Sequence, residues 1–127
     1  CVLFLHPLQL EGIVNLLIQA DIGTVLAQNG IFTESIFPVK LLEFVQMKIP
    51  VIATKTKMLS RYFSSDMLSY LKENTPHAFI NVVMQLYKSK ALRKKLAQNA
   101  LDYLKKHNWN MEEKKYLKII GSDIMPE

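Results

Sequence analysis

A short uncharged run at residues 49–53, Ile-Pro-Val-Ile-Ala, constrains the fold of this chain more than any other stretch. Its β-branched residues favour a strand, and the lack of polar side chains indicates that both faces of the strand are covered. Covered strands of this kind occur in parallel sheets with helices on both sides. The run therefore predicts an α/β fold with a Rossmann-like parallel sheet and flanking helices.

The residues before this run predict a helix that leads into it. Thr33 and Ser35 are residue types that cap helix N-termini, and Pro38 suits a first helical turn because its missing N–H removes no intrahelical bond. The apolar residues at helical spacing are Leu41, Leu42, Phe44 and Val45.

Lys40 and Glu43 stand three residues apart and share one edge of this helix. A helix that begins at the mouth of a parallel sheet directs free N–H groups and its positive dipole end to a place where phosphate can bind. A carboxylate one turn further on can accept hydrogen bonds from a sugar diol. The same pattern also describes an ordinary amphipathic helix with a solvated Lys–Glu pair, and the residues alone leave both interpretations open.

The rest of the chain predicts further strands and helices. Thr75 and Pro76 suit the N-cap and first position of a helix, and Gly121 suits the residue that ends one. We expect one domain over residues 1–127, and we expect its C-terminal part to be helical. The expected strands are residues 2–5, 22–27 and 67–71, and the expected helices are residues 9–19, 55–63 (a helix or turn), 77–87, 91–106 and 111–120.

Charge and cysteine content exclude several classes of function. The net charge is +5, and between Lys88 and Lys118 ten Lys and Arg stand against three Asp and Glu. Such a run is either a solvated helix face or a surface that attracts anions, including an anionic membrane. It carries no nucleic-acid motif, so we expect no specific nucleic acid partner. The single cysteine, Cys1, excludes a disulfide framework and a cysteine metal cluster, which fits a cytoplasmic location or the inner face of a membrane.

Residues 38–44 (PVKLLEF), followed after an interval by residues 50–54 (PVIAT), resemble a segment of glycosyltransferase family 4, P-x-K-L-x-E-(Y/F) followed by P-V-(I/V)-A. Residues 86–93 are also similar to the family's L-x-x-D-P-x-L-R, with Ser89 and Lys90 in place of Asp-Pro. The resemblance implies retaining transferases of the GT-B architecture, with this chain as the later part of the C-terminal, donor-binding domain. A strand at the first residues likewise indicates a piece of a longer protein, so the N-terminal half of the enzyme is an expected partner.

The resemblance also implies roles for individual residues. Glu43 matches the family glutamate that binds the ribose hydroxyls of a nucleoside-diphosphate sugar, and Lys40 matches the motif lysine. The backbone N–H groups around Phe37 and Val39 would face the diphosphate. The loop at residues 28–35, which opens with a turn signal, is the expected place for contacts with the transferred sugar.

Three departures from the family pattern are visible. The position of a first family glutamate falls on Ser35, while Glu34 stands one place earlier, so either residue is a candidate for that position. Lys48 stands where the family usually has glycine, at a position that favours a left-handed backbone. The family's phosphate-binding Arg and Lys precede this segment. The sequence therefore identifies no catalytic residue, and it predicts no metal and no cofactor besides the sugar-nucleotide substrate.

The sequence thus predicts transfer of a sugar from a nucleoside-diphosphate sugar, with this chain alone inactive. One alternative is a nucleotide-sugar 2-epimerase, which would need clustered acid and base groups, while His6, His77 and His107 are widely spaced. The other is a non-catalytic α/β interaction module that binds anionic partners through its basic C-terminal helices. The sequence does not identify the transferred sugar, the base of the nucleotide or the acceptor.

Overall fold

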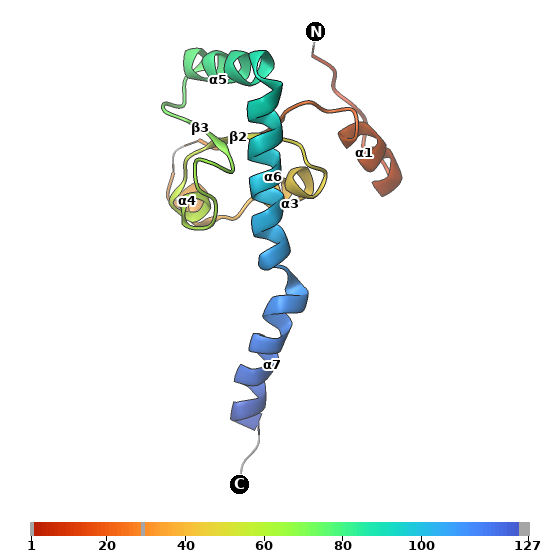
Figure 1. Ribbon diagram of the computed structural model, residues 1–127, viewed down its shortest axis with the longest axis vertical. Coiled ribbons are helices and arrows are strands. Elements are labelled where there is room, and N and C mark those ends of the chain that lie inside the picture. Colours follow the sequence, from red (N-terminus) through yellow and green to blue (C-terminus); the bar gives the residue numbers. More distant parts are fainter. Residues whose placement is uncertain (1, 29, 125–127) are drawn as a thin grey trace.

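The computed structural model describes residues 2–28 and 30–124, and Figure 1 shows their arrangement. Helices and short strands alternate over the first half of the chain, and the second half is mostly helical. The strands are β1 (Gly23–Val25), β2 (Val51–Thr54) and β3 (Ser69–Leu71). The helices are α1 (Leu10–Leu17), α2 (Ile31–Ser35), α3 (Val39–Gln46), α4 (Lys57–Tyr62), α5 (Pro76–Lys88), α6 (Lys90–Lys106) and α7 (Trp109–Ile124).

The three strands form a parallel sheet in the order β1-β2-β3. In its register Gly23 pairs with Val51 and Ile52 pairs with Ser69. All four residues of β2 are buried, as its uncharged sequence predicts. The predicted α/β fold with a parallel sheet and flanking helices is therefore confirmed.

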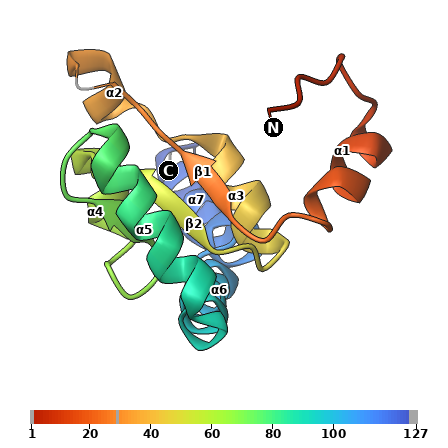
Figure 2. The same cartoon turned by 90° about the horizontal axis from the view of Figure 1, so that it is seen from above.

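Successive residues of β2 point to opposite faces of the sheet, so the strand joins two hydrophobic clusters. Val51 and Ala53 belong to a cluster under α3 and α6, whereas Ile52 belongs to a cluster with Leu86 of α5. Figure 2 shows α5 on one side of the sheet and α3 on the other. Because helices cover both faces of the sheet, the residues of β2 before Thr54 are all apolar.

The turn between α3 and β2 uses a left-handed residue. Lys48 has φ 57°, and in the described part of the chain it is the only residue other than glycine with positive φ. Its N–H donates to the carbonyl of Val45, and the N–H of Ile49 donates to the carbonyl of Phe44. These bonds close the end of α3, which confirms the expectation that this position takes a glycine-type conformation.

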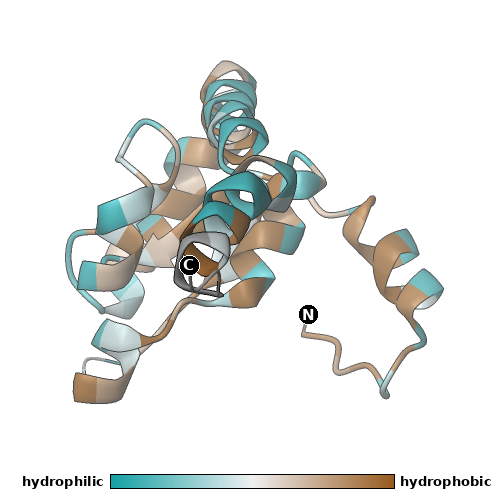
Figure 3. Cartoon of the chain, turned by 90° about the horizontal axis from the view of Figure 1, so that it is seen from below, coloured by the Kyte–Doolittle hydropathy of each residue, from teal (hydrophilic) through white to brown (hydrophobic). Residues whose placement is uncertain are grey.

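Residues 2–5 do not form the expected strand. They lie outside any helix or strand, and the side chain of Phe4 is 94% exposed. An apolar run becomes a strand only when another strand pairs with it, and none of the described strands does so here. Figure 3 shows this apolar segment and α1 standing apart from the body of the molecule, to which α1 contributes its one buried side chain, Leu17.

Several boundaries differ from expectation. The expected loop at residues 28–35 contains the short helix α2, and Asn29 lies outside the described residues. Neither Thr33 nor Ser35 caps α3: Pro38 is its N-cap, and the Thr33 hydroxyl donates to carbonyls of the preceding turn instead. Helix α7 continues through Gly121 to Ile124, so Gly121 does not end the last helix as expected; a glycine inside a helix weakens the helix but does not by itself end it.

Candidate functional site

The carboxyl ends of the three strands are tied together by two side chains. The N–H of Ala27, just after β1, donates to Oγ1 of Thr54 at the end of β2 (3.1 Å). Nδ2 of Asn74, beyond β3, donates to the carbonyl of Ala27 (3.0 Å). Ligands of open parallel sheets collect at this edge. The sequence analysis did not single out Thr54 or Asn74, although a threonine that ends an otherwise apolar strand is a usable signal.

Helix α3 begins at this same edge. Pro38, its N-cap, lines a small cavity of about 120 Å³ together with Val25 of β1 and Thr54 of β2. Proline has no side-chain acceptor for the first amides of the helix, and the side chain of Val39 is exposed. The N-terminus of α3 therefore offers its first N–H groups and its positive dipole end near the strand ends.

Lys40 and Glu43 form an ion pair on the exposed side of α3. Nζ of Lys40 lies 3.0 Å from Oε2 of Glu43, and about half of each side chain is exposed. The Lys40 ammonium also lies 5.6 Å from the centre of the Phe44 ring. An exposed ion pair contributes about 1 kcal/mol or less, so a ligand can recruit either group at little cost. The geometry agrees with both interpretations that the sequence left open.

Glu34 has a different neighbour. Its Oε2 accepts a hydrogen bond from the backbone N–H of Lys57, the first residue of α4 (2.7 Å). The Ser35 hydroxyl donates to the carbonyl of Ile31 at a long 3.4 Å. Glu34 and Ser35 line an open cavity of about 540 Å³ with Lys57 and Arg61.

The six residues predicted for the site therefore lie in three places. Val39, Lys40 and Glu43 share the first turns of α3, whereas Glu34 and Ser35 face α4 across the open cavity. Phe37 lines a third cavity with Leu42, between α3, α4, α6 and α7. The sequence analysis missed Lys57 and Arg61, which are four residues apart on α4 and bring positive charge to Glu34 and Ser35.

Some of the basic side chains between Lys88 and Lys118 are exposed, whereas others bond within the chain. The guanidinium of Arg93 donates to the carbonyls of Leu86 and Tyr87, so it closes the end of α5. The lysines at positions 94, 95, 105 and 106 of α6 are exposed.

In the part of the chain whose side chains the structure describes, no three His, Cys, Asp or Glu side chains are grouped so that they could hold a metal ion. Over the same residues, no helix has the length and hydropathy needed to cross a membrane.

Comparison of the chain with models of known protein families, with curated proteins and with solved structures found no match. The resemblance of residues 38–44 and 50–54 to glycosyltransferase family 4 therefore stays a prediction made from the residues.

Proposed function

We propose that this chain is the donor-binding part of a retaining glycosyltransferase of the GT-B architecture, which uses a nucleoside-diphosphate sugar. The observation that carries the proposal is the position of the Lys40–Glu43 pair. It stands on the exposed side of α3, in the first turns of a helix that begins where β1 and β2 end. The three-stranded parallel sheet and the left-handed Lys48 also agree with the expected Rossmann-like fold and its turn after α3.

In this proposal the carboxylate of Glu43 accepts hydrogen bonds from the two ribose hydroxyls. A carboxylate has enough lone pairs to accept both while Lys40 stays close to one of its oxygens. The first amides of α3 and the Lys40 ammonium lie near the diphosphate. Positive groups of this kind stabilise the negative charge that develops on the diphosphate as it leaves the sugar.

Glu34 and Ser35 have separate parts in the proposal. Glu34 already accepts the N–H of Lys57, so we assign it to holding α2 against α4. Among the described residues the Ser35 hydroxyl bonds only to the carbonyl of Ile31, at a long 3.4 Å, so we assign this hydroxyl to the transferred sugar. Acceptor binding belongs to the N-terminal half in the family, so the 127-residue chain is expected to bind nucleotide and to transfer no sugar.

Calorimetric titration of the chain with UDP and GDP tests this proposal. Glu43→Ala is expected to weaken binding about 10-fold or more, since a hydrogen bond to a charged group contributes about 1.5–3 kcal/mol. Glu113→Ala, which removes an exposed carboxylate from α7, is the matched control and is expected to leave the affinity unchanged. Equal affinities for the two variants would refute the proposed role of Glu43.

The exposed lysines of α6 favour one alternative, a module that binds anionic partners. The same titration with an oligonucleotide and with anionic vesicles, at two salt concentrations, separates the two functions. Binding through a lysine surface falls steeply with salt and does not depend on Glu43. The proposed donor site instead predicts specific nucleotide binding that Glu43→Ala weakens at both salt concentrations.

A further inference from the structure

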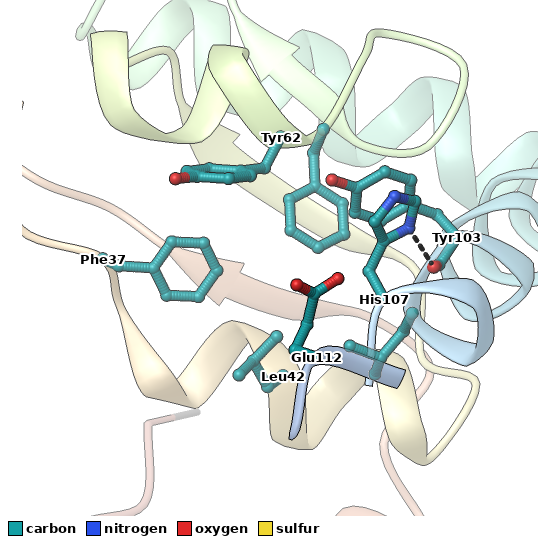
Figure 4. A pocket seen from close by; sticks show the side chains of 8 residues that line it. Phe37, Leu42, Tyr62, Tyr103, His107 and Glu112 are labelled. Atoms are coloured by element: carbon teal, nitrogen blue, oxygen red, sulfur yellow. Dashed lines mark hydrogen bonds between the residues drawn. The ribbon is translucent and has the colours of Figure 1, made fainter. Parts of the chain in front are cut away.

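Side chains from helices α3, α4, α6 and α7 line an open cavity of about 440 Å³. Figure 4 shows its side chains. The wall consists mainly of aromatic rings, and among the described lining residues the one acidic group is the carboxylate of Glu112, from the first turn of α7. The lining residues are Phe37, Leu42, Tyr62, Phe63, Tyr103, Leu104, His107 and Glu112, and the imidazole of His107 stacks on the Tyr103 ring at 4.2 Å.

The aromatic rings form a continuous wall. The ring of Phe37 meets that of Tyr62 edge-on at 6.0 Å and that of Phe63 at 6.3 Å, measured between ring centres. Phe63 then lies 5.2 Å from Tyr103. Phe63 is buried, and its carbonyl accepts a hydrogen bond from the hydroxyl of Tyr70. Burial and this bond fix the position of Phe63, the ring between Phe37 and Tyr103 in the wall.

The carboxylate of Glu112 brings a negative charge to this wall, and the Glu112 side chain is 44% exposed. In Figure 4 it points from α7 into the space between Phe37 and Tyr103. Its Oε1 pairs with Nζ of Lys115 at 2.9 Å, and the Lys115 side chain is 70% exposed. The faces of aromatic rings carry partial negative charge, so the rings do not stabilise an anion placed against them. A cation inside the cavity would satisfy both the rings and the carboxylate.

We propose that this cavity binds a small organic cation with a methylated ammonium head. Such a group gains cation–π attraction from the ring faces and Coulomb attraction from Glu112, and it is weakly enough hydrated to enter an apolar cavity. The volume of about 440 Å³ lies in the range of small-ligand sites. The carboxylate would repel an anion, and it would give a neutral apolar ligand no Coulomb attraction. The inference does not depend on the proposed transferase function.

Titration of the 127-residue chain with choline and with its neutral isostere 3,3-dimethyl-1-butanol tests the proposal. Choline is expected to bind at least about 10-fold more tightly than the alcohol, as a desolvated cation–π contact of about 2 kcal/mol implies. Glu112→Gln keeps the shape of the side chain and is expected to reduce this preference, because the Coulomb attraction is lost while the aromatic rings remain. Glu113→Gln, the adjacent acid on α7, is the matched control and is expected to keep it.

A second pair of variants tests the same point from the opposite direction. Lys115→Gln removes the cation that competes for Glu112 and is expected to tighten choline binding several-fold, whereas Lys114→Gln is expected to have no effect. Pull-down by phosphatidylcholine vesicles that Glu112→Gln reduces would identify a lipid headgroup as the source of the cation, and choline binding without vesicle binding would identify a free cation.

The proposal is overturned if choline does not bind, if the neutral isostere binds equally well, or if Glu112→Gln behaves like Glu113→Gln. Thermal unfolding of each variant verifies that it is folded. Tyr62→Ala is a further variant at a partly exposed ring, and it is expected to weaken choline binding without loss of fold.

Discussion

Oε2 of Glu34 lies 2.7 Å from the backbone nitrogen of Lys57 and accepts its hydrogen bond. This contact joins the end of α2 to the first turn of α4, where Thr56 accepts the N–H of Leu59 in the same way. A carboxylate at a helix start satisfies a free N–H and interacts favourably with the helix dipole. Glu34 is therefore part of the frame that shapes the carboxyl edge of the sheet.

Removal of this carboxylate is expected to reduce stability. Glu34→Ala should lower the free energy of unfolding by about 1–2 kcal/mol, as loss of a helix cap does. Ser35→Ala, at the neighbouring position, should cost less because its single hydrogen bond is long. Urea denaturation of both variants measures the difference. Equal stability of Glu34→Ala and the parent chain would show that the contact with Lys57 contributes nothing.

Replacement of Lys48 by glycine is expected to stabilise the folded protein. Its φ of 57° is unfavourable for a residue with a Cβ atom, and Lys48→Gly should raise the free energy of unfolding by about 0.5–1 kcal/mol. Lys48→Ala removes the same charge but keeps the Cβ atom, so it should give no gain. Denaturation curves of the two variants separate the backbone effect from the charge effect, and a gain in both would assign it to charge.

Gly23 lies against Phe44, and this contact leaves no room for a side chain. A Cβ atom at Gly23 would stand 2.7 Å from the Phe44 ring, so Gly23→Ala should lower the free energy of unfolding by about 1–3 kcal/mol. Gly121→Ala is the control, because a Cβ atom there meets nothing within 4 Å. If Gly23→Ala unfolds at the same urea concentration as the parent, the packing of α3 on β1 is looser than described.

Tyr70 links stability to pH. Burial raises the pKa of Tyr70 from 10.0 to about 12. The unfolded chain therefore releases this proton before the folded chain does. The contribution of Tyr70 is fully present below pH 10 and is lost as the pH rises to 12.

Tyr70→Phe isolates this effect from the other groups that titrate at high pH. At pH 8 the variant should be less stable by about 1 kcal/mol, because it lacks the hydrogen bond to the carbonyl of Phe63. Between pH 10 and 12 the difference between the parent and Tyr70→Phe should shrink. A difference that stays constant over this range would contradict the raised pKa.

The parts of the fold that follow from local sequence were predictable. The apolar residues of β2 indicated a covered strand, and Thr75 and Pro76 take the N-cap and first position of α5, where the Thr75 hydroxyl accepts the N–H of Ala78. Lys48 took the left-handed conformation because the turn from α3 into β2 requires it. In each case neighbouring residues along the chain determine the outcome.

Features that depend on distant contacts were not predictable. Residues 2–5 have the composition of a strand, but composition does not determine whether another strand lies beside them to pair with. The burial of α5 is one such feature, since Ile80, Met84 and Tyr87 are exposed and Leu86 is the one residue of that helix that is buried among those described. A helix packed on one edge of a small sheet buries less of its surface than its apolar pattern suggests.

The candidate site shows the same division. The edge shared by Lys40 and Glu43 follows from their spacing, and the structure pairs them. The contact between Glu34 and Lys57 spans 23 residues, and the cavity of Phe37 and Glu112 collects side chains from four helices. No local sequence pattern indicates which side chains meet when they are so far apart along the chain.

The account depends most on Glu43 as the acceptor for a ribose diol, and a double-mutant cycle measures that contact directly. The parent chain and Glu43→Ala are each titrated with UDP and with 2′-deoxy-UDP. We expect the parent to prefer UDP about 10-fold or more and Glu43→Ala to bind the two nucleotides equally, since the lost preference belongs to the contact with the removed carboxylate. The same preference in both proteins, or none in the parent, would contradict the donor site at the start of α3.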